Sequence, residues 1–462
     1  MLTDTADATR DSGRAGTLAR PGVIIVFSGS SLVYLPFSIE SRPLNVGRAG
    51  DLEAVLTDER LSRHHAEVSV VDGQWVVRDL GSRNGTFVDG RRVEGEVRVP
   101  ALRVVRAAGT LIVPCADISR ARMPEVSPSG TVIGTKLRDS LALVEHWAAA
   151  SDTMLIRGES GTGKELAAQT FHGKGPNARG PFIAVNCAAI PEGLAERLLF
   201  GAKRGAYSGA NTDSIGHVEA ADGGVLFLDE GGELDLQVQA KLLRVMESRE
   251  VIPLGASHGK RVSVRVCVAT HRDLRAAVAA GRFRGDLYHR IAPPEVLLPP
   301  LRERLDDIAF HVVDEISRAA PGTAPQCKMI EACILRHWPG NVRELRKQIR
   351  YAAIRAQAEG VDRVRLEHLP ATAGEPLSTN RPSLTPAAPP EAPRENNTRP
   401  YTRWSQQLTR EAVEQVLAEN GGNVAFAARA LGMQRSQLYR EMERLEIDRG
   451  GRARREGGGD RE

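Results

Sequence analysis

The stretch that decides the fold is TMLIRGESGTGKELAAQTF, residues 153–171. An apolar run at 153–157 leads into the glycine-rich segment GESGTGKE at 158–165, and residues typical of a helix follow. The spacing of Gly158, Gly163 and Lys164 is that of a phosphate-binding loop. Glycines let backbone N–H groups crowd around phosphate oxygens, the helix amino-terminus adds its dipole, and a lysine reaches the β and γ oxygens.

A second motif, GGVLFLDE at 223–230, strengthens this interpretation. A buried strand there delivers Asp229 as the expected Mg²⁺ partner, and Glu230 is placed to polarise an attacking water. Glu165 occupies the position where a serine or threonine usually follows the lysine, so no hydroxyl is offered to Mg²⁺ there. Together the motifs predict ATP hydrolysis with Mg²⁺. The candidate nucleotide-binding residues of the loop are Gly158, Glu159, Ser160, Gly161, Thr162, Gly163, Lys164 and Glu165.

The sequence around these motifs predicts several domains. From about 131 to 300, helical patterns alternate with apolar strands, which indicates an α/β unit with a parallel sheet, and 302–369 is expected to be wholly helical. Residues 22–115 show short β-branched runs broken by the turn signals Asp72-Gly73 and Asp89-Gly90, which indicates an all-β sandwich. A proline-rich linker over 370–404 precedes a small all-α domain at 405–447.

Composition sets further bounds. A chain of 462 residues is too long for one core, and a net charge of +4 is too small to indicate nucleic-acid binding by itself. Five scattered cysteines lack metal-ligand spacing and are expected to be reduced thiols. The first twenty residues have no apolar signal-peptide core and no apolar run is long enough for a membrane span, so we expect a cytoplasmic protein with no membrane partner.

Residues 131–369 resemble the AAA+ domain of bacterial enhancer-binding proteins, the ATPases that activate sigma-54 RNA polymerase. The similar segments include PFIAVNCAAIPE, LFGAKRGAYSGA, GRFRGDLYHRI, PPLRERLDDI and WPGNVREL, in the family's order. The resemblance implies that Asn186 is the switch partner of Glu230, that Thr270 is the first sensor and that Arg343, on the helical lid, is the second. It also implies a hexameric ring, assembled from dimers, that contacts sigma-54 RNA polymerase.

In this family, two arginines reach the nucleotide of the neighbouring subunit, and the corresponding residues are Arg284 and Arg290. An arginine supplied in trans stabilises charge on the transferred phosphoryl group and ties hydrolysis to assembly. Solvated surface charge is the alternative for both side chains. The chain departs from the family pattern at His271, where asparagine is usual after the sensor threonine, and at Gly231, where isoleucine is usual.

The family's polymerase-contact loop, GAFTGA, corresponds to Gly205, Ala206, Tyr207, Ser208, Gly209 and Ala210. The aromatic and hydroxyl characters are kept, and glycines at both ends allow a hinge motion. The resemblance therefore implies that these six residues contact sigma-54. An ordinary surface loop with one tyrosine is the alternative.

The segments NVGRAG (45–50), LSRHHAEV (61–68) and DLGSRNGTFVDG (79–90) resemble the forkhead-associated (FHA) domain, a phosphothreonine reader. The resemblance implies that Arg48 and Ser62 bind the phosphate, aided by Arg63 or Arg83, and that Asn84 bonds the peptide backbone. His65 is expected to be buried and to brace the loops. For Arg63 and Arg83 a solvated role is equally open. Guanidinium groups suit a dianionic phosphate, and the partner would be a phosphothreonine protein from a Ser/Thr kinase pathway.

Residues 408–447 resemble the Fis-type helix-turn-helix domain that binds double-stranded DNA at enhancer sites. Arg435, Ser436, Gln437 and Arg440 are expected to face the major groove or its phosphates. A small helical bundle that only packs or dimerises is the alternative.

These observations predict a DNA-bound, ATP-dependent activator of sigma-54 RNA polymerase, controlled by the FHA domain in place of a receiver domain. The rival hypothesis is a phosphopeptide-binding, DNA-bound regulator or scaffold whose AAA+ ring no longer engages sigma-54. Tyr207, Ser208, Gly231 and His271 favour the rival.

Overall fold

The computed structural model describes residues 20–40, 42–49, 56, 58–191, 193–207, 211–376 and 410–420, together with 424, 427, 428, 431, 435–445 and 447. The chain divides into two compact units, one within residues 1–380 and one within 381–462. Of the predicted linker over 370–404, residues 370–376 are described, and 377–404 lie outside the described residues. Among the described helices, none is long and apolar enough to cross a membrane. All five cysteines are free thiols, as predicted.

The amino-terminal part is the predicted β-sandwich. A six-stranded sheet, ordered β2-β1-β10-β9-β6-β7, faces a four-stranded sheet, ordered β3-β4-β5-β8. Buried aliphatic side chains such as Ile25, Leu44 and Val77 fill the space between them. The strands are β1 (Gly22–Ser28), β2 (Ser31–Ser38), β3 (Leu44–Val46), β4 (Ala66–Val71), β5 (Gln74–Asp79), β6 (Thr86–Val88), β7 (Arg91–Arg92), β8 (Glu96–Val99), β9 (Val105–Ala107) and β10 (Thr110–Cys115).

Both predicted hairpin turns are present. Asp72 and Gly73 have φ of 51° and 75° between β4 and β5, and Asp89 and Gly90 have φ of 47° and 80° between β6 and β7. Two successive positive φ values make a turn whose twist matches that of the flanking strands. The turn residues therefore fix the register that places the loops after β3 and β5 at one end of the sandwich.

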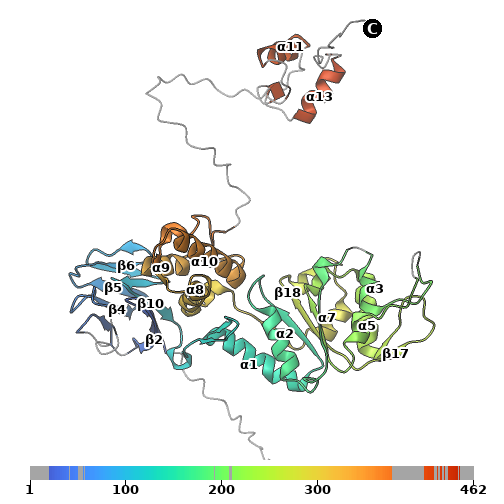
Figure 1. Cartoon of the computed structure of the whole chain (residues 1–462), viewed down its shortest axis with the longest axis horizontal. Helices are drawn as coiled ribbons and strands as arrows, with labels where there is room; N and C mark the ends of the chain where they lie inside the picture. Colours follow the sequence, from blue (N-terminus) through green and yellow to red (C-terminus); the bar gives the residue numbers. More distant parts are fainter. Residues whose placement is uncertain are drawn as a thin grey trace, which may run out of the picture. The chain divides into compact units, whose positions relative to one another are not determined.

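The central part is a five-stranded parallel sheet ordered β14-β15-β18-β13-β19, with helices beside it (Figure 1). The phosphate loop leaves the carboxyl end of β13, and Asp229 and Thr270 end the neighbouring strands β15 and β18. The elements are β11 (Glu125–Val126), β12 (Val132–Ile133), α1 (Thr135–Ala150), β13 (Thr153–Arg157), α2 (Lys164–Gly173), β14 (Phe182–Asn186), α3 (Ala195–Phe200), α4 (His217–Ala220), β15 (Val225–Asp229), α5 (Leu236–Ser248), β16 (Glu250–Val251), β17 (Lys260–Arg261), β18 (Arg265–Thr270), α6 (Leu274–Ala279), α7 (Gly285–Ile291) and β19 (Glu295–Leu297).

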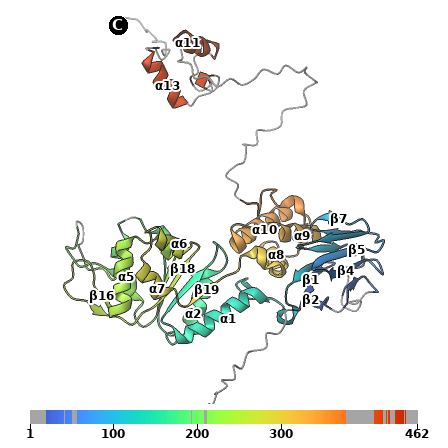
Figure 2. The same ribbon diagram turned by 180° about the vertical axis from the view of Figure 1, so that it is seen from behind.

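The lid that follows contains α8 (Leu305–Ala319), α9 (Cys327–Leu335) and α10 (Asn341–Ala358), which are grouped together in Figure 2. The expectation of a wholly helical segment was wrong in one detail. The short strands β20 (Ala324–Pro325) and β21 (Arg363–Val364) pair in parallel. This pairing satisfies backbone groups of the two connections between helices, which have no helical partners of their own.

The six-stranded sheet of the sandwich and the lid share one hydrophobic core. Phe27 and Val113 of the sheet belong to the same buried cluster as Ile308 and Trp338 of the lid. Polar contacts at the edge of this core also join the two parts: Arg103 Nη2 donates to Ile334 O at 2.7 Å and Arg106 Nε donates to Glu331 Oε2 at 2.7 Å. The sandwich is therefore packed on the lid, a contact between segments far apart in the chain that the sequence did not indicate.

The carboxyl-terminal unit contains α11 (Arg410–Glu419) and α13 (Arg435–Arg444). Val413, Ala427, Ala428, Leu438 and Met442 form its small buried cluster. The predicted helical character is confirmed over these residues.

The buried ion pair between the sandwich and the lid generates a stability prediction. Arg106 and Glu331 are 6% and 5% exposed, so Glu331→Ala leaves a guanidinium buried without its partner. Removing one member of such a pair costs about 3–5 kcal/mol of unfolding free energy. Urea denaturation should show this loss. Lys260→Ala, which breaks the pair that this exposed lysine makes with Glu219, is the control and should leave the free energy of unfolding nearly unchanged, because water screens such a pair. If Glu331→Ala and Lys260→Ala both lowered the free energy of unfolding by the same small amount, this result would contradict the packing of the sandwich on the lid.

Candidate nucleotide site

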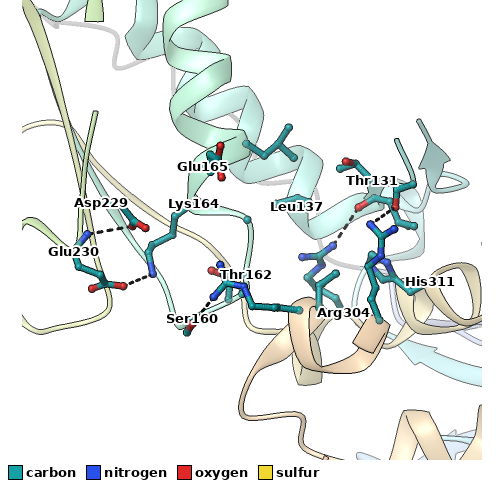
Figure 3. A pocket seen from close by; sticks show the side chains of 18 residues that line it. Thr131, Leu137, Ser160, Thr162, Lys164, Glu165, Asp229, Glu230, Arg304 and His311 are labelled. Carbon is teal, nitrogen blue, oxygen red and sulfur yellow. Dashed lines mark hydrogen bonds and ion pairs between the residues drawn. The ribbon is translucent and has the colours of Figure 1, made fainter. Parts of the chain in front are cut away.

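A cavity of about 310 Å³ lies between the α/β unit and the lid, and we call it the interdomain pocket (Figure 3). Its lining includes loop residues 160–165, Asp229 and Glu230 from the α/β unit, and Arg304, His311 and Arg343 from the lid. Residues far apart in the sequence thus meet around one space. Two of the predicted loop residues, Gly158 and Glu159, are not in this lining.

Glycines shape the loop. Gly163 has φ of 109° and caps α2, and an added Cβ there would meet no atom within 4 Å, so the backbone lies open toward the pocket. Gly161 has φ of 78°, and its added Cβ would lie 2.3 Å from Gly340 O of the lid. Positive φ and this close approach both require glycine. The loop therefore combines an exposed backbone with a tight contact to the lid.

Lys164 and Glu230 form the charged centre of the pocket. Lys164 Nζ is 3.0 Å from Glu230 Oε1 and donates to Gly158 O at 3.2 Å. Burial would raise the pKa of the Glu230 carboxyl, but hydrogen bonds from His271 and Lys164 outweigh it, so this pKa lies below its usual range. Burial raises the pKa of Asp229. The two carboxyl groups thus differ in their affinity for a proton.

His271 contacts Glu230, which the sequence did not reveal. Its Nδ1 lies 2.7 Å from Glu230 Oε2, and its backbone N–H donates to the same oxygen at 3.3 Å. Glu230 itself has φ of 52°, a left-handed conformation that is costly for a residue with a side chain. The imidazole and Lys164 together hold this carboxylate in place.

The predicted switch and sensor residues lie around this centre. Asn186 ends β14, and its Oδ1 accepts from Ala188 N at 3.0 Å; no bond to Glu230 is recorded among the described residues. Thr270 is buried, and its Oγ1 accepts from Arg272 N at 3.0 Å. Arg343 Nη1 donates to Ser160 Oγ at 3.0 Å. Of the two predicted sensors, Arg343 contacts the phosphate loop through its side chain, whereas Thr270 does so through its backbone carbonyl, which accepts from Gly158 N at 3.2 Å.

Arg284 and Arg290 lie outside the lining of the interdomain pocket. Arg284 is paired with Asp286 at 2.8 Å, and Arg290 Nη2 donates to Met246 O at 3.3 Å. Arg284 directly precedes α7 and Arg290 lies in its last turn, and neither lines the pocket at the chain's own phosphate loop. Their placement fits a role toward a second subunit and equally fits surface charge.

Asn341 is a residue at the phosphate loop that motif reasoning missed. It is fully buried, its Nδ2 donates to Glu159 Oε2 at 3.1 Å and to Ser160 O at 3.0 Å, and its Oδ1 accepts from Leu301 N. Arg302 pairs with the same Glu159 carboxylate at 2.8 Å. The asparagine in WPGNVREL was a visible signal, but only the fold brings it to the loop.

The predicted polymerase-contact loop is described in part, because Ser208, Gly209 and Ala210 lie outside the described residues. Gly205 has φ of 82°, consistent with a turn that needs glycine. Tyr207 is exposed, and its hydroxyl accepts a hydrogen bond from Arg197 Nη1 at 2.8 Å. The Arg197 guanidinium carbon also lies 5.1 Å from the ring centroid. The ring is thus held at the surface by one arginine.

The predicted phosphothreonine residues gather on neighbouring loops of the sandwich. Arg48 N donates to Ser62 O at 3.0 Å, and Arg83 N donates to Ser62 Oγ at 3.1 Å. Asn84 Nδ2 donates to Arg60 O at 2.6 Å. The side chains of Arg48, Arg63, Arg83 and Asn84 are exposed. Three segments separated in sequence therefore form one polar surface.

His65 is buried beneath this surface, as predicted. Its Nδ1 accepts from Ser62 N at 3.1 Å, which leaves Nε2 to donate to Gly85 O at 3.2 Å. Burial lowers the pKa of the imidazole, so the neutral form that makes both bonds is favoured. His65 ties the loop after β3 to the loop before β6, and its bracing role is confirmed.

The predicted DNA-contact residues Arg435, Ser436, Gln437 and Arg440 lie on α13, and Arg440 is exposed. The side chains of the first three lie outside the described residues.

Comparison with known proteins matches four family models to successive parts of the chain. They are the FHA domain at 44–105, the sigma-54 interaction domain at 132–296, the AAA+ ATPase lid domain at 302–385 and the bacterial regulatory protein, Fis family, at 407–445. The three parts predicted from the motifs are each matched, and in the predicted order.

Curated relatives include the nitric oxide reductase transcription regulator NorR2 of Cupriavidus necator, 40% identical over 77% of this chain and 68% of its own length. The anaerobic nitric oxide reductase transcription regulator NorR of Citrobacter koseri is 40% identical over 65% of this chain and 60% of its own length. The hydrogenase transcriptional regulatory protein HoxA of Bradyrhizobium diazoefficiens is 39% identical over 66% of this chain and 62% of its own length. The chain thus spans about 60% to 68% of the length of these relatives.

Among solved structures, NtrX from Brucella abortus in complex with ADP is similar over 69% of this chain and 70% of that chain, with a TM-score of 0.48 and 29% identity. The fold class and the family expected from the motifs are both confirmed by the domain matches. The chain belongs to the sigma-54-dependent transcriptional regulators, with an FHA domain, an AAA+ ATPase domain with its lid, and a Fis-type helix-turn-helix domain.

Proposed function

We propose that this chain binds DNA upstream of promoters and uses ATP hydrolysis to activate sigma-54 RNA polymerase, under control of phosphothreonine recognition by its FHA domain. The observation that carries the proposal is the convergence of Lys164, Asp229, Glu230 and Arg343 on the interdomain pocket. Transcription from a sigma-54 promoter in vitro, with purified chain and ATP, is the direct test. No transcript with the parent protein would favour the rival scaffold function.

The pocket fits a nucleotide on physical grounds. The Gly163 backbone is open toward it, Lys164 supplies a buried ammonium, and buried nitrogens of Arg304 and His311 lack hydrogen-bond partners among the described residues. Asp229 provides a carboxylate oxygen, the ligand type that Mg²⁺ prefers alongside phosphate oxygens. With Mg²⁺, ATP supplies the phosphoryl group whose transfer to water releases the energy used by the ring.

The residues around the phosphate end have separable tasks. Lys164 would hold phosphate oxygens and Asp229 would hold the metal, whereas Glu230 would orient and polarise a water. In the structure Lys164 is paired with Glu230. Turning the ammonium toward phosphate would release one of the three contacts on the Glu230 carboxylate, so nucleotide binding and the position of this carboxylate would be linked. His271 would retain the other two contacts, through Nδ1 and its backbone N–H, which hold the pKa of this carboxyl below its usual range.

Arg284 and Arg290 are proposed to complete the site of the adjacent subunit in a hexameric ring. Neither lines the pocket of its own chain, yet both are exposed at the surface of the α/β unit, Arg284 directly before α7 and Arg290 within it. An arginine in trans is worth about 10³–10⁵ in rate. Hydrolysis per subunit that does not depend on protein concentration would contradict this assignment.

The FHA domain is proposed to control the ATPase through the lid on which it packs. Asn84 bonds the backbone of Arg60, Arg60 pairs with Asp58, and Asp58 accepts from Gly109 N at 2.7 Å. Gly109 lies between β9, which carries Arg106, and β10. The proposed phosphopeptide loops are thus joined by hydrogen bonds to the turn that follows the strand of Arg106, the residue that pairs with Glu331 of the lid.

Glu230→Gln should separate nucleotide binding from hydrolysis. The amide keeps the size of the side chain but cannot take up a proton from water, so hydrolysis should fall by at least about 10²-fold while ATP affinity is retained. Phosphate release and fluorescent-nucleotide binding measure the two properties. Glu233→Gln, three residues on and paired with Arg272, is the matched control. Parallel loss of binding and hydrolysis in Glu230→Gln would contradict the assigned role.

Tyr207→Ala should separate hydrolysis from transcription. The exposed ring lies outside the lining of the pocket, so ATP turnover should stay within a few-fold of the parent while activation is abolished. Tyr207→Phe removes only the hydroxyl bonded to Arg197 and should retain activation. Tyr351→Ala, which removes an exposed tyrosine of α10, is the control. Equal losses of turnover and activation in Tyr207→Ala would indicate a structural role for the ring.

Arg48→Ala should abolish phosphopeptide preference. Hydrogen bonds to charged groups are worth about 1.5–3 kcal/mol, so affinity for a phosphothreonine peptide should fall at least about tenfold while the unphosphorylated peptide is unaffected. Calorimetry against a degenerate peptide library measures this. Arg98→Ala, an exposed arginine on β8 paired with Glu96, should leave affinity unchanged. No preference for phosphorylated peptide in the parent would reject the FHA part of the proposal.

A further inference from the structure

The end of the interdomain pocket opposite Lys164 and Glu230 has an unusual polar group. Figure 3 shows His311 there beside Arg304 and Thr131. His311 lies on α8 and is 3% exposed. Neither of its ring nitrogens has a hydrogen-bond partner among the described residues. A buried imidazole with both nitrogens unpaired costs free energy of folding, so its presence calls for a partner that the chain itself does not supply.

The protonation state of His311 limits what that partner can be. Burial, together with the positive charges of Arg304 and Arg346, holds the pKa of the imidazole well below its usual range. The ring is therefore neutral, with one nitrogen that donates and one that accepts. It is suited to a neutral polar group and poorly suited to a phosphate, which the loop at the other end of the pocket binds.

The surroundings of His311 match a heteroaromatic base. Val132, Leu137 and Val342 line the same cavity and offer apolar surface. Arg304 Nη2 donates to Val132 O at 3.4 Å and Arg346 Nη1 donates to Gly130 O at 3.2 Å, so the backbone that walls this end is fixed by lid residues. A flat ring with polar atoms at its edge would contact the apolar walls and meet the imidazole.

We propose that His311 is a base-recognition residue, whose neutral imidazole hydrogen-bonds the edge of the purine when a nucleotide occupies the interdomain pocket. The inference rests on the proposed function, since it requires that the pocket binds ATP. It adds a specific role for a lid residue outside every motif singled out in the sequence. Because His311 is on α8 and the phosphates are held by the α/β unit, the base would connect the lid to the phosphate loop.

The test compares His311→Leu with the parent for two ligands, ATP and inorganic triphosphate, each competing with a fluorescent nucleotide on the full chain. A hydrogen bond of this kind is worth roughly two- to tenfold in affinity. We expect that loss for ATP and no change for triphosphate, which has no base. His311→Gln keeps a donor and an acceptor and should recover part of the affinity for ATP.

Stability without nucleotide provides an independent readout. Leucine replaces an unpaired polar ring with an apolar side chain, so His311→Leu should melt at the same temperature as the parent or higher. His368→Leu is the matched control. His368 is also a buried lid histidine, but its Nδ1 accepts from Arg365 N at 3.0 Å and its Nε2 lies 3.0 Å from Glu359 Oε2. This control should melt lower and leave the ratio of the two affinities unchanged.

The outcomes are distinct. Equal affinity of parent and His311→Leu for ATP, or equal losses for ATP and triphosphate, would overturn the inference and leave a merely structural histidine. If the parent itself binds neither ligand, the proposed ATPase function fails first. A loss for ATP alone, with partial recovery in His311→Gln and no fall in melting temperature, supports base recognition.

Discussion

The direct contact between the phosphate loop and the first turn of α10 is the constraint on which the nucleotide site depends. Gly161 lies so close to Gly340 O that a side chain would not fit, and Val342 N donates to Gly161 O at 3.2 Å. Asn341 adds bonds to Glu159 and Ser160. Because these bonds join the two walls of the pocket, a shift of the lid changes the shape of the loop.

The same contact explains the unusual backbone of this region. Trp338 and Asn341 both have positive φ, at 53° and 49°, which is costly for residues with side chains. Trp338 is fully buried in the core shared with the sandwich and its Nε1 donates to Cys333 O, while Asn341 is buried against the loop. Packing and hydrogen bonds on both sides of this turn hold it in place, so the core of the lid and the phosphate loop are mechanically linked.

The lid is therefore hydrogen-bonded to two other parts of the same chain. On one side α10 meets the phosphate loop, and on the other α9 meets the sandwich through Arg106 and Glu331. A buried ion pair contributes little net stability but is costly to break, so it favours one docking geometry over others. This arrangement gives the proposed phosphothreonine control a physical route, because the lid, on which the FHA domain packs, also carries Arg343 and His311.

The sequence by itself determined the fold classes and most of the chemistry. Glycine spacing around Lys164, an apolar strand ending in Asp229, and aspartate-glycine turns are local patterns with local causes, and local patterns are readable without coordinates. The segment beyond residue 302 was predicted as wholly helical because two-residue strands carry no periodic signal. Contacts between distant segments were decided only by the tertiary structure: His271 against Glu230, Asn341 in the phosphate loop, and His311 in the pocket. In these contacts the partners of His271 and Asn341 lie 41 and 182 positions away, and they are brought near only when the sheet and the lid have formed.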